Sequence, residues 1–424
     1  MENGKPLVSI ITPTHRVDYL GEAWESLKKQ THTDWEWVLV PNNGAVIPEE
    51  MAADPRVKIF PFEEKKIGAL KRYACEQAQG KIIIEFDHDD MLMPTAVEET
   101  VAAFALDPAI TFVYSNTVEF RNGSWEPFTY AAKYGWRYLP FIYEGHELQE
   151  AIAFEPTPAS IGYIWYAPNH LRSWTKEAYD RVGGHNPTME VIDDHDLMCR
   201  FYIDGKMHHI DKPLYLYRVC DNNTWLEKNA LIQSETRRIY ATYIYRLIEK
   251  WADTNGLLKI DLGAHRGDGG PKHYKSVDIR PGCDYQMDLN GRWGFEDNSV
   301  GVIRAFDTFE HLTDKIHVMN EAHRVLAPGG VLLLMIPSSD GRGAFQDPTH
   351  VSYWNTNSLW YFTNKQYADF VPEITCRFQA LRSVTDFPSD FHKENDISYV
   401  IAELFALKNG YQRPNNHIPG LIEI

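Results

Sequence analysis

Residues 81–90 read Lys-Ile-Ile-Ile-Glu-Phe-Asp-His-Asp-Asp, and this stretch decides the fold class of the first half of the chain. The apolar run Ile82–Phe86 has the length of a buried strand and leads directly into three carboxylates, Asp87, Asp89 and Asp90. Such an uninterrupted apolar strand is typical of a parallel sheet that helices cover on both faces. Ligands of these sheets bind at the carboxyl ends of the strands, so we expect the chemistry beside the acidic cluster.

The sequence around this strand repeats an alternation of strand and helix signals. It predicts strands at Leu7–Thr12, Trp35–Val40 and Val57–Phe60, and helices at Tyr19–Gln30, Ile67–Gln79 and Met91–Ala102. An amphipathic helix follows at 227–252, and a second strand–helix pattern begins at Leu257–Leu262. We therefore predict an α/β protein with a first domain at 1–226, a linking helix at 227–253 and a second domain at 254–424. Residues 120–165 are rich in aromatic side chains but too weakly periodic to assign.

Composition excludes several classes of protein. The chain has 424 residues, and its 42 Lys and Arg against 59 Asp and Glu give a formal charge of −17, which disfavours a broad nucleic-acid-binding face. Its five cysteines include no Cys-x-x-Cys pair, which fits a reduced cytoplasmic enzyme better than a disulfide scaffold or a structural zinc site. We expect no membrane span and no signal peptide, because neither a long apolar run nor an apolar leader is present.

Two acidic runs are candidate sites, and each has a structural alternative. Neighbouring carboxylates such as Asp87 and Asp89 repel one another unless a cation joins them, and oxygen ligands suit Mg²⁺ or Mn²⁺ bound with substrate phosphates. The alternative is a solvated turn or a cap for the next helix. A second run, Asp193–Asp196, has the same alternative, as caps of a helix over Leu197–Tyr202.

Seven segments in order over residues 6 to about 225 resemble a family 2 glycosyltransferase, an inverting enzyme of GT-A fold that uses a nucleotide-sugar donor. The segments are Val8–Arg16, Trp35–Gly44, Gly68–Gly80, Asp87–Asp90, Thr175–Gly184, Asp193–Leu197 and Pro213–Arg218. The resemblance implies a GT-A nucleotide-sugar-binding domain in the first half of the chain.

The resemblance also implies roles for single residues. It assigns nucleotide-sugar binding to Pro13, Thr14, Asn42, Lys71 and Asp87, the Mn²⁺ or Mg²⁺ ion to Asp89, and the catalytic base to Asp194. The cation would neutralise the departing diphosphate, and the base would deprotonate the acceptor hydroxyl. Asn42–Asn43 stands where the family usually has an acidic pair that reads uracil, so a UDP-sugar is favoured only mildly. Cys220 stands where some relatives supply a late His to the metal, and Asp221 or water could substitute for it.

Residues 257–365 resemble a class I methyltransferase dependent on S-adenosylmethionine, with a Rossmann-like fold. The segments that carry this resemblance are Leu257–Gly270, Ser276–Ile279, Met287–Leu289, Val302–Leu312 and Glu321–Ile336. It implies that Gly263 cradles the amino-acid end of the cofactor, Asp278 the ribose and Asp288 the adenine. His265 replaces a glycine of the usual turn, so a degenerate domain that does not methylate is an alternative. Asp347–His350 has counterparts in some relatives, without a role that we can derive.

We therefore expect transfer of a sugar from a nucleotide sugar to a hydroxyl of a glycan, a protein, a small molecule or a modified nucleobase. The alternatives are a methyltransferase, or a bifunctional enzyme, whose first domain positions the acceptor, and a scaffold protein with two retired sites. Residues 165–174 precede the expected base, where the family binds acceptors. The aromatic side chains there could stack on an acceptor or pack in the core.

Overall fold

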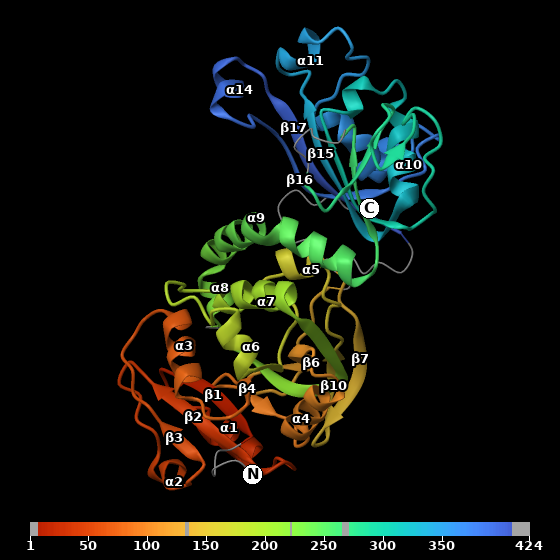
Figure 1. Cartoon of the computed structure of the whole chain (residues 1–424). Coiled ribbons are helices and arrows are strands. Elements are labelled where there is room, and N and C mark those ends of the chain that lie inside the picture. The colour runs from red at the N-terminus through yellow and green to blue at the C-terminus, as the bar shows by residue number, and fades with distance from the viewer. Residues whose placement is uncertain (1–6, 132–134, 221–222, 265–270, 409–424) are drawn as a thin grey trace. The chain divides into compact units, whose positions relative to one another are not determined.

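The computed structural model describes residues 7–131, 135–220, 223–264 and 271–408. The chain divides into two compact units, residues 1–244 and 245–424. The border falls inside the long helix α9 (Asn229–Thr254), which Figure 1 draws in green.

The first unit alternates strands and helices along its early part. Its strands are β1 (Val8–Thr14), β2 (Trp35–Pro41), β3 (Val57–Ile59), β4 (Ile82–Glu85), β5 (Met91–Leu92), β6 (Ile110–Arg121), β7 (Tyr138–Tyr143), β8 (His146–Ala151), β9 (Arg172–Thr175) and β10 (Lys206–Val219). Its helices are α1 (Leu20–Lys28), α2 (Glu49–Ala52), α3 (Ile67–Gln77), α4 (Ala96–Leu106), α5 (Pro158–Tyr163), α6 (Lys176–Arg181), α7 (Asp193–Asp204) and α8 (Thr224–Glu227).

These strands form one mixed sheet in the order β3-β2-β1-β4-β9-β6-β10-β5, and the hairpin β7–β8 pairs with β6. Strands β3, β2, β1 and β4 are parallel, so their carboxyl ends meet at one edge. The order of the strands reverses between β1 and β4. Ligands of open α/β sheets bind at such a reversal. Thr14 and Asp87 come at or just after the ends of these two strands and therefore flank it.

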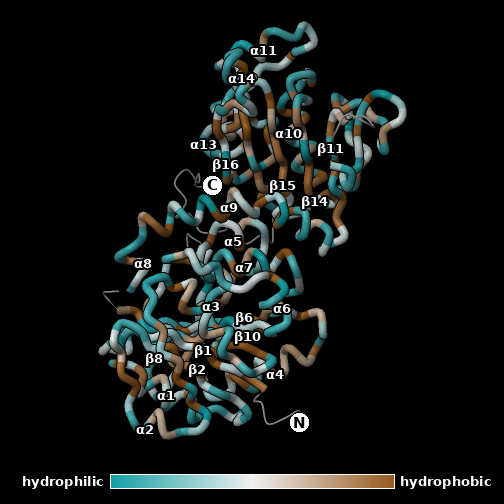
Figure 2. Tube along the Cα trace, turned by 60° about the vertical axis from the view of Figure 1, so that its left-hand side comes forward, coloured by the Kyte–Doolittle hydropathy of each residue, from teal (hydrophilic) through white to brown (hydrophobic). Residues whose placement is uncertain are grey.

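Alternating side chains of the sheet build two cores. Ile10, Trp37 and Ile84 face α1 and α4, whereas Ile11 and Val38 face α3, α6 and α7. A strand that is buried on both faces can be apolar on both, which is why β2 and β4 are almost wholly apolar, each with a single buried glutamate, Glu36 or Glu85. Figure 2 shows brown, the hydrophobic colour, alternating with white and teal along the strands of this sheet. The predicted three-layer α/β arrangement of this unit is confirmed.

Two predictions of local structure need correction, and one unassigned stretch can now be described. Met91 and Leu92 form β5 and pair with β10, and the helix predicted from Met91 begins only at Ala96, because Pro94 disfavours a helical conformation in the residue before it. The acidic run does not precede α7 but forms its first turn, which begins at Asp193. The unassigned stretch 120–165 forms the hairpin β7–β8 and the short helix α5.

The second unit has its own sheet, in the order β13-β12-β11-β14-β15-β17-β16. The strands are β11 (Leu258–Leu262), β12 (Lys275–Asp278), β13 (Tyr285–Gln286), β14 (Val300–Phe306), β15 (Leu326–Pro337), β16 (Phe378–Asp386) and β17 (Tyr399–Ala406). The helices and 3₁₀ turns are η2 (Phe309–His311), α10 (Lys315–Val325), α11 (Gly343–Gln346), η3 (Thr356–Leu359), α12 (Trp360–Thr363), α13 (Lys365–Ala368) and α14 (Asp390–Glu394).

The first five strands of this order are parallel, and β17 runs antiparallel to its neighbours β15 and β16. The order reverses between β11 and β14, so a ligand-binding edge is again expected there. Helix α10 packs one apolar stripe, including Val318 and Ala322, onto the sheet, and Asp314 caps its first turn. Within the described ranges, no helix combines the length and the apolar character that a membrane crossing needs.

Candidate active site

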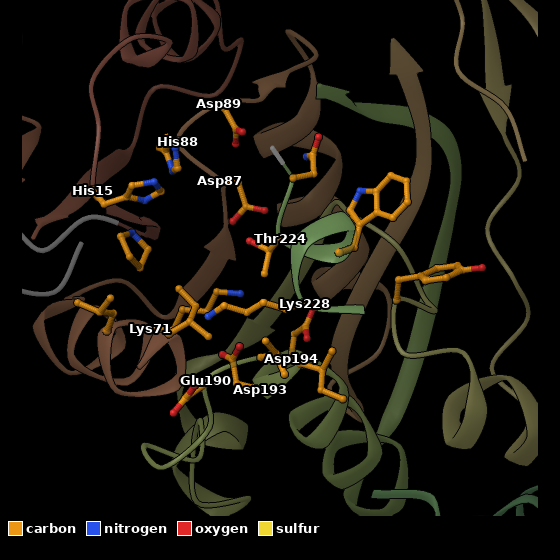
Figure 3. Close-up of a pocket in the computed structure, with 18 of the residues that line it drawn as sticks. His15, Lys71, Asp87, His88, Asp89, Glu190, Asp193, Asp194, Thr224 and Lys228 are labelled. Carbon is orange, nitrogen blue, oxygen red and sulfur yellow. The ribbon is translucent and has the colours of Figure 1, made fainter. Parts of the chain in front are cut away.

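A cavity of about 860 Å³ opens at the carboxyl edge of the first sheet. Every residue that the sequence predicted for nucleotide-sugar binding, metal binding or catalysis in this unit lines it, namely Pro13, Thr14, Asn42, Lys71, Asp87, Asp89 and Asp194. They come from β1, the segment after β2, α3, the turn after β4 and α7. Figure 3 shows Asp87 and Asp89 toward one end of the cavity, Asp193 and Asp194 toward the other, and Lys71 between the two pairs.

Asn42 lies at the end of β2 with a buried side chain. Its amide nitrogen donates to the carbonyl of Glu64 at 3.1 Å, and its Oδ1 atom has no hydrogen-bond partner within the described ranges. The neighbouring Asn43 is held through its backbone N–H, which donates to Glu63 Oε2 at 3.0 Å. Asn42 therefore keeps one buried acceptor atom without a partner in the described ranges.

Of the three carboxylates in the acidic turn after β4, two line the cavity and one is buried. Asp87 and Asp89 are half-buried on the cavity wall, and Asp87 Oδ2 lies 3.6 Å from His170 Nε2. Asp90 is buried away from the cavity and accepts from the hydroxyl of Tyr215 at 2.8 Å and from the backbone N–H of Arg218 at 2.7 Å. It ties the turn to β10, and it does not cap α4, whose N-cap is Thr95. Burial, with help from Asp89 and Asp87, raises the pKa of Asp90.

The late metal ligand considered at Cys220 is not on the cavity wall that the structure describes. Burial raises the pKa of the Cys220 thiol, so it stays protonated at neutral pH and is a poor partner for a hard cation. Asp221, the other residue considered there, lies outside the described residues, as do His265 and Arg266 of the second unit.

Four charged groups are paired at the wall of the cavity, which Lys71, Arg172 and Asp194 line, whereas Glu85 is buried. The Lys71 ammonium and the Glu85 carboxylate form a buried ion pair, and Arg172 forms another with Asp194. Arg172 Nη1 also lies 3.6 Å from Glu85 Oε2, so the two pairs join into one network. Burial alone would lower the pKa of Lys71, but Asp193, Glu85 and Asp194 raise it well above its usual value. The lysine therefore stays charged, as buried charges in a paired network must.

Asp193 and Asp194 begin α7 directly after Ile192, whose φ of +47° is a left-handed conformation that is unfavourable for a β-branched residue. Neither aspartate is the N-cap. The side chain of Asp194 is 17% exposed on the cavity, whereas that of Asp193 is 2% exposed, with its Oδ2 atom 3.6 Å from His185 Nε2. Of the two carboxylates, Asp194 is the one that an incoming hydroxyl can reach.

The structure adds residues on the cavity wall, and one buried residue paired with Lys71, that the sequence did not identify. Glu85 is the only polar residue inside the apolar run 82–86. A lone carboxylate in a buried strand needs a partner, and this feature of the sequence could have identified it. Glu119, on β6, is buried with its Oε1 atom 3.3 Å from the amide of Asn169 and its Oε2 atom unpartnered within the described ranges. The cavity also has an aromatic wall. Tyr130 and Tyr166 each stack on Trp136, and Trp225 meets Tyr130 edge to face.

The residues of the segment 165–174, considered for acceptor binding, differ in where they lie. Trp165, Asn169 and His170 line the cavity, whereas Trp174 is 1% exposed and packs in the core beneath the sheet. Arg172 does not face an acceptor freely, because its guanidinium is paired with Asp194 and Glu85.

In the second unit, the three predicted cofactor residues follow neighbouring strands at one edge of the sheet. Gly263 directly follows β11 with a φ of +74°, and a Cβ there would lie 2.4 Å from the hydroxyl of Thr308, so glycine is required. Asp278 ends β12, and its carboxylate accepts from the Arg280 guanidinium at 2.8 and 3.0 Å. Asp288 is exposed just beyond β13. The placement fits the cofactor, although Asp278 is already engaged by Arg280.

Comparison with known proteins matches each of the two units to a protein family. Residues 9–163 match the model of "Glycosyl transferase family 2", and residues 272–334 match that of "Methyltransferase domain". The chain is 28% identical over 230 residues to a chondroitin synthase of Escherichia coli, a match that covers 53% of this chain and 30% of that protein. It is 37% identical over 90 residues to "Probable S-adenosylmethionine-dependent methyltransferase" of Mycolicibacterium smegmatis, covering 20% of this chain and 33% of that one. The chain thus spans about a third of each of these two relatives.

Among solved structures, TarS 1–349 of S. aureus in complex with UDP-GlcNAc aligns with a TM-score of 0.40 and 16% identity, over 59% of this chain and 74% of that one. The two family matches agree with the two sheets described above and confirm the predicted fold class, a GT-A unit followed by a Rossmann-like methyltransferase-like unit. The chain therefore carries a family 2 glycosyl transferase domain in its first unit and a methyltransferase domain in its second.

Proposed function

We propose that the first unit transfers a sugar, with inversion, from a nucleotide-sugar donor to an acceptor hydroxyl. The observation that carries this proposal is the single cavity in which seven predicted donor, metal and catalytic residues gather from five separate segments. The family 2 match over the same unit supports the reaction class. Among the acceptors that the sequence left open, the similarity to a chondroitin synthase favours a glycan.

The donor that fits best is a UDP-sugar. Asn42 lines the cavity, and its buried, unpartnered Oδ1 atom could accept an N–H of a pyrimidine base after a small rotation of the side chain. Lys71 is already paired with Glu85, so another positively charged side chain is needed beside the diphosphate. Lys228 lines the same cavity and has no ion-pair partner in the described part of the chain, and we assign it that role.

The divalent cation would be held by Asp89, with Asp87 beside it. Both are half-buried carboxylates on the cavity wall, and hard oxygen donors of this kind suit Mn²⁺ or Mg²⁺. When bound, the cation neutralises the charge that develops on the departing diphosphate. His170, beside Asp87, stays neutral at pH 7, because burial and the nearby Arg172 lower its pKa to about 4.

Asp194 would act as the base. In inversion, the acceptor oxygen bonds to the anomeric carbon on the face opposite the leaving nucleoside diphosphate, and the acceptor proton passes to the base. Burial would raise the pKa of Asp194, but Arg172 and Lys71 together hold it below its usual value. The carboxylate is therefore ionised before the acceptor arrives, and Arg172 fixes its orientation.

Slow hydrolysis of the donor, which needs no acceptor, tests this proposal. The protein is incubated with Mn²⁺ and a panel of UDP-, GDP-, CMP- and dTDP-sugars, and release of the nucleotide is followed. We expect turnover of at least one UDP-sugar, and loss of both turnover and Mn²⁺-dependent nucleotide affinity in Asp89→Asn. Absence of binding and turnover across the panel would refute the proposed function. Unchanged Mn²⁺-dependent affinity in Asp89→Asn would refute only the metal assignment.

We propose methyl transfer from S-adenosylmethionine as a second function, in the second unit. Its support is the methyltransferase-domain match together with the placement of Gly263, Asp278 and Asp288 along one sheet edge. The two activities would make the chain bifunctional, with separate cofactor sites in separate units.

A further inference from the structure

Glu310, His311 and His350 bring potential metal ligands together in the second unit. One ligand atom of each side chain lies within 4.8 Å of the other two, and no other group of three or more such side chains is found in the described ranges. Glu310 and His311 belong to the turn η2, which follows β14, and His350 comes from the loop after α11. Asp347 adds a second carboxylate, with its Oδ2 atom 4.0 Å from His350 Nε2.

The Glu310 carboxylate is buried without a hydrogen bond. Its side chain is 2% exposed, and neither of its oxygen atoms has a hydrogen-bond partner among the described residues. The backbone amides of Thr308 and Glu310 itself lie near the carboxylate but outside hydrogen-bond geometry. An unpaired buried carboxylate destabilises a fold by several kcal/mol, roughly, unless a cation or a proton compensates it.

The backbone holds this carboxylate beside His350. The carbonyl of Glu310 accepts from the N–H groups of Val351 and Ser352 at 2.8 and 3.0 Å, which fastens the loop carrying His350 to η2. The cluster is therefore a built feature of the fold and not a chance meeting of surface side chains.

Hydrogen bonds to backbone carbonyls determine which histidine nitrogens are protonated. His350 Nδ1 lies 2.9 Å from the carbonyl of Ala344, which can only accept, so Nδ1 carries the proton and Nε2 presents a lone pair. That lone pair faces Glu310 Oε1 and Asp347 Oδ2, each at 4.0 Å.

His311 follows the same rule. Its Nδ1 atom lies 3.2 Å from the carbonyl of Thr349, while the Thr349 hydroxyl donates to Asp347 Oδ1 at 2.7 Å. Nδ1 is again the donor, and Nε2 keeps the lone pair. A neutral imidazole that donates its other N–H to a backbone carbonyl is the usual arrangement of a metal-binding histidine.

The lone pair of His350 Nε2 thus faces two carboxylates, each at 4.0 Å, and a cation held between these groups would offset their mutual repulsion. Ligand bonds of about 2.0–2.2 Å place two ligand atoms of one ion roughly 3–4.2 Å apart. The separations of 4.0–4.8 Å are close to this range, so small side-chain movements would bring the donors to one ion.

We propose that Glu310, His311 and His350, with Asp347 beside them, bind a divalent transition-metal ion. Two imidazole nitrogens with a carboxylate favour ions such as Zn²⁺, Fe²⁺ or Co²⁺ over Mg²⁺ and Ca²⁺, which prefer oxygen ligands. The site lies just beyond β14, which borders the reversal of strand order in the second sheet, and His311 and Asp347 open it to solvent. The ion would therefore keep open positions for an oxygen atom of a small ligand. This site is independent of the proposed sugar transfer.

Equilibrium dialysis of the untagged full-length chain with Co²⁺, after removal of metals and without nucleotide, tests the proposal. We expect one Co²⁺ per chain with ligand-field absorption and without a thiolate charge-transfer band. Glu310→Gln and His350→Gln should each weaken binding at least about tenfold. His392→Gln, a matched histidine change elsewhere in the second unit, should bind Co²⁺ like the wild type.

Glu310→Gln keeps the side-chain shape and removes a buried charge, so its metal-free melting temperature should not fall. If that variant nevertheless misfolds, His311→Gln changes an exposed ligand and gives the same test. Saturable Co²⁺ binding that survives Glu310→Gln and His350→Gln, a thiolate band, or no binding at all would each overturn the proposed site.

Discussion

Asp193 and Asp194 are neighbours in the chain, yet their carboxylates have opposite electrostatic surroundings. Burial raises the pKa of Asp193 to about 7, and the negative charges of Asp194 and Glu85 contribute to the rise. The positive charge of Lys71 opposes it in part. Asp194 instead faces the Arg172 guanidinium, which holds its pKa below the usual value. A base must be ionised and must reach its substrate. Asp194 meets both conditions, while the more basic Asp193 is buried against His185.

Asp194→Asn should slow sugar transfer by ~10²–10⁴-fold, because the amide keeps the shape of the side chain and cannot accept the proton. Donor affinity, measured by calorimetry, should stay near the wild-type value, since the base acts on the acceptor. Asp193→Asn and Asp196→Asn are the matched controls, and Asp196 is already bound by Tyr243 and Arg200. If Asp193→Asn abolishes transfer and Asp194→Asn does not, the base is Asp193.

Glu119 should make the stability of the first unit depend on pH. Burial raises its pKa to about 8, although the amide of Asn169 lowers it in part. The stabilising contribution of the protonated side chain is complete below the unfolded-state pKa near 4.5 and is lost as the pH rises through about 8. Glu119→Gln should therefore gain stability over the wild type by on the order of 2–4 kcal/mol more at pH 8 than at pH 5.

Urea unfolding of the first unit at these two pH values measures the gain. Ser115 lies on the same strand and is likewise buried, and its hydroxyl bonds to the backbone of Asn116 and Leu171, so Ser115→Ala is the control. It should change stability equally at both values. An equal effect of Glu119→Gln at both pH values would contradict the assignment of the pKa.

At the scale of elements, helix α3 brings Lys71 to the cavity only because it approaches the loop before α7 very closely. A Cβ at Gly68 would lie 2.1 Å from the backbone carbonyl of Asn186, and the Gly68 N–H donates to the carbonyl of Met189 at 3.2 Å. The first turn of α3 and the segment that leads into Asp193 are thus in direct backbone contact. Glycine is required there for space.

Gly68→Ala should push α3 away from this segment and misplace Lys71. We expect a loss of stability of roughly 1–3 kcal/mol, the usual range for overpacking, together with weaker nucleotide binding. Gly21→Ala in α1 is the matched control, because nothing lies within 4 Å of its added Cβ, and it should be neutral or slightly stabilising. Thermal unfolding and nucleotide titration of both variants measure the contrast. Equal effects of the two substitutions would contradict the close-contact explanation.

At the scale of the whole molecule, each unit has its own sheet, its own core and its own reversal of strand order. The residues proposed for sugar transfer all belong to 1–244, and those proposed for methyl transfer all belong to 245–424. The two activities should therefore respond to substitutions independently.

S-adenosylmethionine should stabilise the chain against thermal unfolding in proportion to its affinity for the folded second unit. Asp278→Ala should abolish that stabilisation, because it removes the carboxylate proposed to bind the ribose, and should leave hydrolysis of the nucleotide sugar unchanged. Asp284→Ala, at an exposed acid between β12 and β13, is the control. No stabilisation of the wild type at millimolar cofactor would argue for a domain that does not methylate.

The sequence by itself determined most of the first α/β pattern. The runs at Leu7–Thr12, Trp35–Val40 and Ile82–Phe86 became β1, β2 and β4, and the helix predicted at Ile67–Gln79 became α3. These elements are encoded by periodicity over a few residues, a local property. The carboxyl ends of parallel strands must then meet, which is why the predicted residues of the first unit line one cavity.

The tertiary structure alone decided which charges meet. Arg172 pairs with Asp194 across 22 residues, and Lys71 pairs with Glu85 across 14. Asp90 is bonded to Tyr215 across 125 residues, and Glu310 faces His350 from a different loop. Such contacts depend on the register of β4 against β9 and on the packing of loops, which no local pattern encodes. For the same reason, the aromatic stretch 120–165 became a wall of the cavity only once α8 and the segment before β9 had packed against it.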